Sequence, residues 1–206
     1  MHLFNPKVQE RIRNTFGYFS AACMGTGAFM YLFRNSNLVF MNPWLLLACS
    51  IGTMVGTQLC DYQTNWLVKN MFYAGFIGTM SASMLPLIHM YSMPVIYDAL
   101  IATGVTVGGL GAVAYNAPSE QFLNWGGPLA LGLGGMLGVS LLSIVYPNSA
   151  ALYNIYLYGG LVLFSAFLMY DTQKIIYRAK TEMRYDPINN SLHVYMDAVN
   201  LFVRFV

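Results

Sequence analysis

The strongest constraint on how this chain folds is a series of long apolar stretches separated by short polar breaks. They cover residues 15–33, 43–60, 71–92, 95–115, 126–146 and 151–170. A helix needs roughly 20 apolar residues to cross the hydrocarbon core of a bilayer, and each stretch is close to that length. Turn-forming residues such as Asn42-Pro43 and Met93-Pro94 occupy the breaks. The pattern predicts six transmembrane helices.

The composition supports a membrane protein. Charged residues make up 9 % of the 206 positions and apolar residues 57 %, whereas a soluble domain carries about 25 % charged residues. The surface of such a chain must face lipid, so the bilayer is its first expected partner. A net charge of +2, without a basic–aromatic patch, argues against nucleic acid as a partner.

Lysine and arginine residues predict the orientation. With the N-terminus inside, the inner segments carry eight basic residues and the outer loops carry only Arg34. The eight are Lys7, Arg11, Arg13, Lys69, Lys174, Arg178, Lys180 and Arg184. We therefore expect a basic N-terminal segment (1–14) and a polar loop (171–187) on one face, with residues 15–206 forming a single membrane domain. The sequence leaves open whether an organellar presequence precedes Met1.

The C-terminal segment has a polar stripe. His193, Asp197, Asn200 and Arg204 follow the spacing i, i+4, i+7 and i+11, which places them on one face of a helix. Nearly all other residues from Leu192 to Val206 are apolar. A stripe of this kind is unsuited to lipid and should face a protein interior or a water-filled path. We expect a seventh helix here.

Asp171 and Asp197 are the candidate functional pair. Asp171 ends the sixth apolar stretch, and a short polar loop would return the chain beside it. A carboxylate at mid-helix depth costs on the order of 2.5–3.5 kcal/mol, so it needs a partner, a proton or a cation. Two neighbouring carboxylates would share a proton, and without it they offer the oxygen ligands that calcium prefers. The pair predicts a proton-controlled cation site.

A purely structural role is the alternative for both residues. Asp197 could pair with Arg204 or hydrogen bond to His193, and Asp171 could pair with Lys174 or Arg178 at the membrane surface. Catalytic patterns such as Gly-x-Ser-x-Gly or His-x-x-x-His do not occur. We therefore expect neither enzymatic activity nor a cofactor.

Glycines also recur at four-residue spacing. The pairs are Gly52 with Gly56, Gly104 with Gly108, and Gly134 with Gly138. Such faces let helix backbones approach closely. We expect them to pack helices within the chain rather than to form a dimer interface.

Several segments resemble the transmembrane Bax-inhibitor-motif family, and within it the mitochondrial branch of growth-hormone-inducible transmembrane proteins. The resemblance rests on residues 11–13, 117–120, 122–124, 127–129, 158–165, 170–174, 185–189 and 195–197, together with Asn200 and Phe202. It covers most of the chain and is strongest from residue 110 onward.

The resemblance implies a seven-helix fold in which the other six surround the last helix. It also implies a pH-sensitive calcium leak or calcium–proton exchange with Asp171 and Asp197 as the sensor, calcium and protons being the ions concerned. We expect His193, Asn200 and Arg204 to tune that pair. The branch is associated with the mitochondrial inner membrane, cristae organisation and apoptosis. A scaffold without transport, partnered by membrane-organising or apoptotic proteins, and another intracellular membrane are the alternatives. Ion selectivity, direction, stoichiometry and oligomeric state are not fixed by the sequence.

Overall fold

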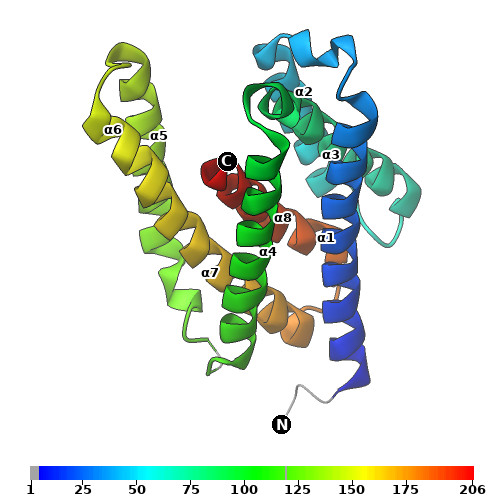
Figure 1. The fold of residues 1–206 in the computed structure, drawn as a ribbon. Coiled ribbons are helices and arrows are strands. Elements are labelled where there is room, and N and C mark those ends of the chain that lie inside the picture. Colours follow the sequence, from blue (N-terminus) through cyan, green and yellow to red (C-terminus); the bar gives the residue numbers. More distant parts are fainter. Residues whose placement is uncertain (1–4, 119) are drawn as a thin grey trace. The chain divides into compact units, whose positions relative to one another are not determined.

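The computed structural model describes residues 5–118 and 120–206, and every regular element in that part of the chain is helical (Figure 1). The α-helices are α1 (Pro6–Phe33), α2 (Pro43–Leu59), α3 (Trp66–Met90), α4 (Met93–Asn116), α5 (Gly126–Val145), α6 (Ala150–Asn154), α7 (Gly160–Thr181) and α8 (Pro187–Phe205). Short 3-10 segments are η1 (Asn37–Phe40) and η2 (Leu123–Trp125), and the π-helical turn η3 (Ile155–Gly159) joins α6 to α7. The all-α prediction is confirmed. Ser119, within the 117–120 motif, and residues 1–4 of the N-terminal segment lie outside the described residues.

Asn-Pro pairs begin two of the helices. The side chain of Asn5 accepts a hydrogen bond from the Lys7 amide at 3.1 Å, and that of Asn42 accepts one from the Trp44 amide at 2.9 Å. In both helices a proline follows the cap. Asparagine satisfies a free amide at a helix start, and proline there already has a helical φ and lacks the N–H that would need a partner.

Four helical segments are long and apolar enough to cross a membrane: Trp66–Met90, Met93–Asn116, Leu123–Val145 and Ala150–Thr181. They correspond to the last four of the six predicted spans. The second predicted span, α2, is apolar but has 17 residues, and the 28-residue α1 is not among the four. The described residues therefore support a multi-pass membrane protein, and the count of six spans around a seventh helix is not confirmed.

The polar segment after Tyr170 differs from its prediction. A loop was expected over residues 171–187, but α7 continues to Thr181, so that prediction is wrong for 171–181. An ion pair of 3.3 Å between Arg178 and Glu182, four residues apart, supports the last turn. At the other end of the chain, residues 6–14 are also helical and continue into α1.

The helices form two compact units. The first comprises the described residues up to Ile96 together with Met183–Tyr195, and the second comprises Tyr97–Glu182 with Met196–Val206. In the first, α3 packs against α1 and α2; in the second, α5 packs against α7 (Figure 1). Helix α8 begins in the first unit and ends in the second. The single membrane domain over 15–206 stays a prediction.

Glycine packing follows the prediction at one site and departs from it at others. A Cβ on Gly56 would lie 2.6 Å from the ring of Phe72, so α2 and α3 meet closely there. A Cβ on Gly104, Gly108 or Gly134 would meet nothing within 4 Å. These helix faces are therefore open within the described structure, contrary to the expectation of internal packing.

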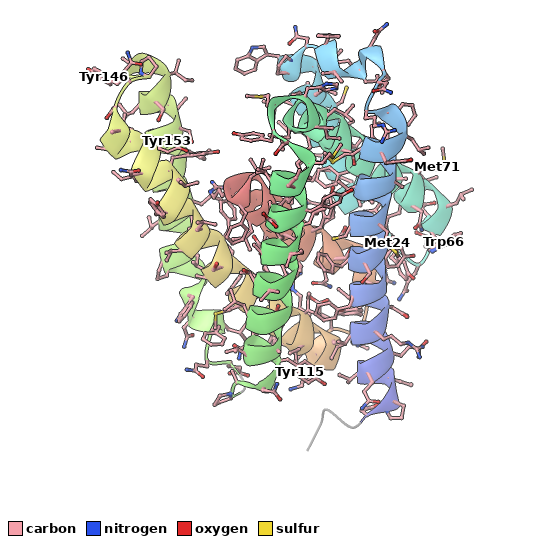
Figure 2. The ribbon with its side chains drawn as sticks, in the orientation of Figure 1. Met24, Trp66, Met71, Tyr115, Tyr146 and Tyr153 are labelled. Carbon is pink, nitrogen blue, oxygen red and sulfur yellow. The ribbon has the colours of Figure 1, made fainter. Side chains whose placement is uncertain are left out.

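Large apolar and aromatic side chains cover the exterior. Met24, Trp66, Met71, Tyr115, Tyr146 and Tyr153 are all exposed (Figure 2). Soluble monomers seldom expose extensive apolar surface, and tryptophan and tyrosine concentrate where helices leave the hydrocarbon core. The exterior therefore matches lipid as the surrounding solvent.

Candidate functional site

The two aspartates singled out from the sequence lie next to each other in the second unit. Asp171 is on α7 and Asp197 on α8, and the two carboxyl groups are close enough to interact electrostatically. The residues are 6 % and 5 % exposed. The predicted proximity is present, and a role in sensing protons or cations stays a prediction.

Two buried side-chain oxygens on α7 and α8 are unsatisfied. Within the described residues, Oδ2 of Asp197 is buried without a hydrogen-bond partner, and so is Oγ1 of Thr172. Buried polar atoms without partners are uncommon and need an explanation. No three His, Cys, Asp or Glu side chains in the described part of the chain are close enough to hold a metal ion together.

Gln173, two residues after Asp171 on α7, was not predicted as a site residue. Its amide oxygen accepts a hydrogen bond from the Phe122 amide at 2.7 Å, and its amide nitrogen donates to the Pro118 carbonyl at 3.0 Å. The glutamine is buried. It therefore ties α7, two residues beyond Asp171, to the connection between α4 and α5. The available signal was its place inside the 170–174 segment.

Arg204 occupies an aromatic cage in the second unit. Its guanidinium carbon lies 4.8 Å from the ring centroid of Tyr156 and 4.6 Å from that of Phe164. Nη1 donates to the carbonyl and to the side-chain oxygen of Asn200, at 2.9 and 3.2 Å. The residue is 8 % exposed, and Gly160 leaves the space that its guanidinium fills. The π-helical turn that carries Tyr156 is of a kind frequent at functional sites.

The other charged residues considered as partners of the two aspartates have different neighbours. Among the described residues no ion pair joins Arg204 to Asp197; Nη1 of Arg204 donates to Asn200, and its Nε is buried without a hydrogen-bond partner. Arg178 pairs with Glu182, and the ammonium group of Lys174 lies 5.2 Å from the ring of Tyr170. His193 is half-buried, in the part of α8 that belongs to the first unit.

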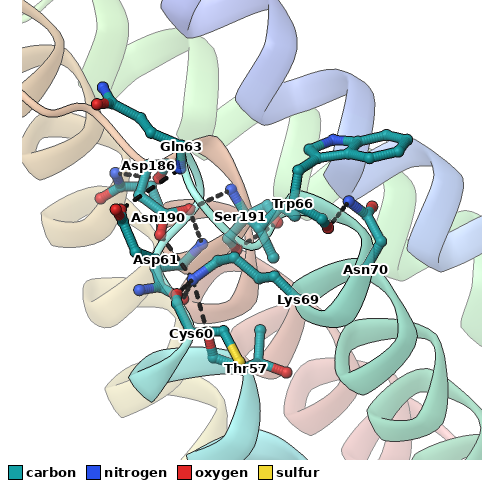
Figure 3. A network of polar contacts seen from close by, with 12 residues as sticks. Thr57, Cys60, Asp61, Gln63, Trp66, Lys69, Asn70, Asp186, Asn190 and Ser191 are labelled. Carbon is teal, nitrogen blue, oxygen red and sulfur yellow. Dashed lines mark hydrogen bonds and ion pairs between the residues drawn. The ribbon is translucent and has the colours of Figure 1, made fainter.

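A second polar cluster, around Lys69 on α3, was also missed (Figure 3). The lysine is 0 % exposed, and its ammonium group lies 2.7 Å from Oδ2 of Asp186. It donates to the backbone carbonyls of Thr57 and Cys60 at 2.6 and 2.8 Å, and to Oδ1 of Asn189 at 2.9 Å. From the sequence, Lys69 is predicted only to be one of the basic residues on the inner face. We name these five residues the Lys69 cluster.

The beginning of α1 approaches the connection between α7 and α8 within the first unit. The guanidinium group of Arg11 donates to the Met183 carbonyl at 3.3 Å and lies 5.5 Å from the ring centroid of Tyr185. The hydroxyl group of Thr15 is also hydrogen-bonded to that of Tyr185. The basic end of α1 and residues 183–185 therefore lie at the same end of that unit.

Comparison with known proteins identifies the family. Residues 8–206 match the family model described as "Inhibitor of apoptosis-promoting Bax1". The growth hormone-inducible transmembrane protein of Rattus norvegicus is 36 % identical, with 96 % of this chain and 62 % of the rat protein covered. Bax inhibitor 1 of Arabidopsis thaliana is 26 % identical, covering 98 % and 81 %. The Golgi anti-apoptotic protein of Vaccinia virus (strain Lister) is 24 % identical, covering 88 % and 75 %.

These matches agree with the fold and with the segments on which the resemblance rests. The chain spans 62 % of the length of the rat protein, and two of the three relatives carry names that refer to Bax or to apoptosis. The family match covers both units and the whole of α8. The chain therefore belongs to the Bax inhibitor family of multi-pass membrane proteins.

Proposed function

We propose that this protein is a pH-dependent calcium leak channel or calcium–proton exchanger of the mitochondrial inner membrane. One observation carries the proposal: Asp171 and Asp197 form a buried pair of neighbouring carboxyl groups in a membrane protein. Protonation of this pair is the gate. Calcium and protons are the transported or regulatory ions, and no resident cofactor is involved.

The chemistry of the pair explains the pH dependence. With one proton shared, the pair holds a single negative charge and its inner oxygens are engaged with each other. Loss of that proton leaves two close carboxylates whose repulsion a divalent cation relieves. Calcium takes about 6–8 oxygen ligands, so two aspartates alone bind it weakly. Weak binding suits conduction, because an ion must leave as readily as it enters. Acid therefore closes the path, and rising pH opens it.

The membrane potential supplies the driving force. A potential of 100 mV is worth roughly 2.3 kcal/mol for each elementary charge. A doubly charged cation that enters a negative compartment gains about twice that amount, so a passive leak needs a gate. In this proposal the aspartate pair is that gate.

The mitochondrial inner membrane is proposed from the resemblance to the mitochondrial branch and from similarity to the rat protein. In the proposed orientation the N-terminus and the α7–α8 connection face the matrix. The contact between Arg11 and Met183 supports placing these two segments on one side. Another intracellular membrane remains the alternative, and the name of the viral relative, a Golgi anti-apoptotic protein, supports it.

A scaffold that organises cristae and restrains apoptosis without transport is the second candidate. Its support is that relatives are named Bax inhibitor 1 and Golgi anti-apoptotic protein. Under this reading Asp171 and Asp197 only stabilise the bundle, and protein partners bind elsewhere. Neither candidate involves enzymatic activity.

Calcium flux into liposomes that contain the purified protein distinguishes the two. The flux is measured across a pH series for the wild type, Asp171→Asn and Asp197→Asn, with the exposed Asp98→Asn as a matched control. We expect either pair substitution to abolish the flux or to remove its pH dependence, and Asp98→Asn to leave both unchanged. Folded wild-type protein that gives no more flux than empty liposomes at any pH would refute transport and favour the scaffold.

A further inference from the structure

The Lys69 cluster joins three helices of the first unit at one buried charge (Figure 3). The ammonium group has three protons and meets four oxygen acceptors within 2.9 Å. Two of them are the carbonyls of Thr57 and Cys60, at the C-terminal end of α2. Helix C-terminal carbonyls lack donors within the helix, and the negative end of the helix dipole attracts a cation. The lysine therefore caps the C-terminal end of α2 by donating hydrogen bonds to its free carbonyls.

The other two acceptors belong to the start of α8. Oδ1 of Asp186 accepts from the amides of Ile188 and Asn189 at 3.0 and 3.1 Å, while its Oδ2 faces Lys69. One carboxylate thus caps α8 and pairs with the buried lysine. The side chain of Asn189 adds a second link from the first turn of α8 to the same ammonium group. The beginning of α8 is therefore held by a charge that comes from α3.

This ion pair differs from an ordinary surface pair. The side chain of Lys69 is 0 % exposed and that of Asp186 is 21 % exposed. Exposed pairs contribute little because water screens them. A buried ammonium group that loses its carboxylate is left uncompensated, which strongly destabilises the surrounding contacts. The contacts of Asp186 and Asn189 with Lys69, which we call the clamp, are therefore costly to break.

A fixed start of α8 has consequences farther along it. The helix is uninterrupted from Pro187 to Phe205, and Asp197 is on it. Each residue of an α-helix advances about 1.5 Å and turns about 100° around the axis. A shift of the first turn by one residue would therefore turn Asp197 to another side of the helix. On an uninterrupted helix, the register of the first turn sets the angular position of every later residue about the helix axis, including that of Asp197.

We propose that Lys69 is a positioning residue for the acidic pair, acting through α8. Its ammonium group fixes the register of that helix by holding Asp186 and Asn189 against the end of α2. The proposal rests on the proposed function in one respect, namely that Asp197 takes part in pH-dependent calcium flux. The clamp itself has a readout that needs no flux.

Two measurements on the full chain in lipid test the proposal, with Lys69→Met, Asp186→Asn and the exposed control Lys7→Met. The first is hydrogen exchange of residues 187–195. Asparagine caps a helix about as well as aspartate, so Asp186→Asn removes the charge and keeps a capping side chain. We expect exchange at the start of α8 to rise at least about tenfold in both cluster variants, which corresponds to about 1.4 kcal/mol. Lys7→Met should leave it unchanged.

The second measurement is the pH at which calcium flux is half-maximal. A displaced Asp197 should move this midpoint by about half a unit or more, since one unit corresponds to about 1.4 kcal/mol between protonation states. A variant with faster exchange but an unchanged midpoint would show that the clamp is purely structural and would overturn the positioning role. Unchanged exchange would overturn the clamp itself.

The design separates this proposal from the proposed function. If the wild type gives no calcium flux, transport fails and the positioning role fails with it, while the exchange data still decide whether Lys69 holds α8. If Lys69→Met does not fold, Asp186→Asn alone carries both measurements. Lys69→Arg keeps the charge but not its size, and exchange between the wild-type and Lys69→Met values would support a requirement for a compact ammonium group.

Discussion

Replacing Gly160 with alanine tests the aromatic cage around Arg204. Gly160 begins α7, and a Cβ there would overlap Nε of Arg204 and lie 2.7 Å from its guanidinium carbon. Alanine is the better helix former by about 0.8–1.0 kcal/mol. At a helix position where the added Cβ touches nothing, a glycine-to-alanine substitution would therefore stabilise the protein. Within the cage the guanidinium group must move, and the sign of the change depends on what it loses.

The contacts of Arg204 set the magnitude. A cation–π contact contributes about 0.5–2 kcal/mol, and a hydrogen bond from a charged group about 1.5–3 kcal/mol. Arg204 makes contacts with the rings of Tyr156 and Phe164 and two hydrogen bonds to Asn200. Losing one of each costs about 2–5 kcal/mol. After the gain in helix propensity, Gly160→Ala should destabilise the protein by about 1–4 kcal/mol.

Thermal or denaturant unfolding of the purified protein in detergent measures this change. Gly134→Ala is the matched control, because a Cβ at Gly134 meets nothing within 4 Å, and it should be neutral or stabilising. In an Arg204→Met background, Gly160→Ala should lose most of its cost, since the flexible methionine side chain can move aside. Equal unfolding free energies for Gly160→Ala and Gly134→Ala would refute the cage as described.

Two further substitutions test packing near the sites. Gln173→Met should destabilise the protein by about 1–3 kcal/mol, because the Phe122 amide, 2.7 Å from the glutamine oxygen, loses its acceptor in a buried position; no change in the unfolding free energy would show that water replaces the glutamine. Gly56→Ala should cost about 1–3 kcal/mol, because its Cβ would lie 2.6 Å from the ring of Phe72. Gly52→Ala, which meets nothing within 4 Å, is its control in the same unfolding assay.

The lipid-facing helices could be predicted from the sequence because lipid leaves few alternatives. Predicted spans at 71–92 and 95–115 correspond to Trp66–Met90 and Met93–Asn116. The loop predicted at 171–187 failed because charge density was interpreted as a helix end. Lysine, arginine and glutamate are good helix formers, so a helix that leaves the apolar layer can continue, as α7 does through Lys174 and Arg178.

The same reasoning explains why one polar site was predicted and the other was not. Asp171 and Asp197 interact through their side chains, which the sequence shows directly. Each is a charged residue beside or within an apolar stretch, so their proximity could be proposed. Lys69 donates to the backbone carbonyls of Thr57 and Cys60, 12 and 9 residues earlier in the chain. Its other partners are the side chains of Asp186 and Asn189, more than a hundred residues later. A carbonyl that lacks a donor at a helix end has no residue type to mark it. The one available signal was a charge near the start of an apolar run.

Helix α8 shows why average hydropathy is a poor guide to a buried helix. It is not among the four apolar spans, although most of its residues are buried. Its polar groups meet polar partners from earlier helices: Ser191 meets Tyr73 at 3.1 Å, Tyr195 meets Thr26 at 2.8 Å, and Asp197 meets Asp171. A hydropathy average counts each of these polar groups as if it were exposed to lipid, but none of them faces lipid. The cost that applies is that of a missing partner, so the partners on α1, α3 and α7 determine where α8 is stable.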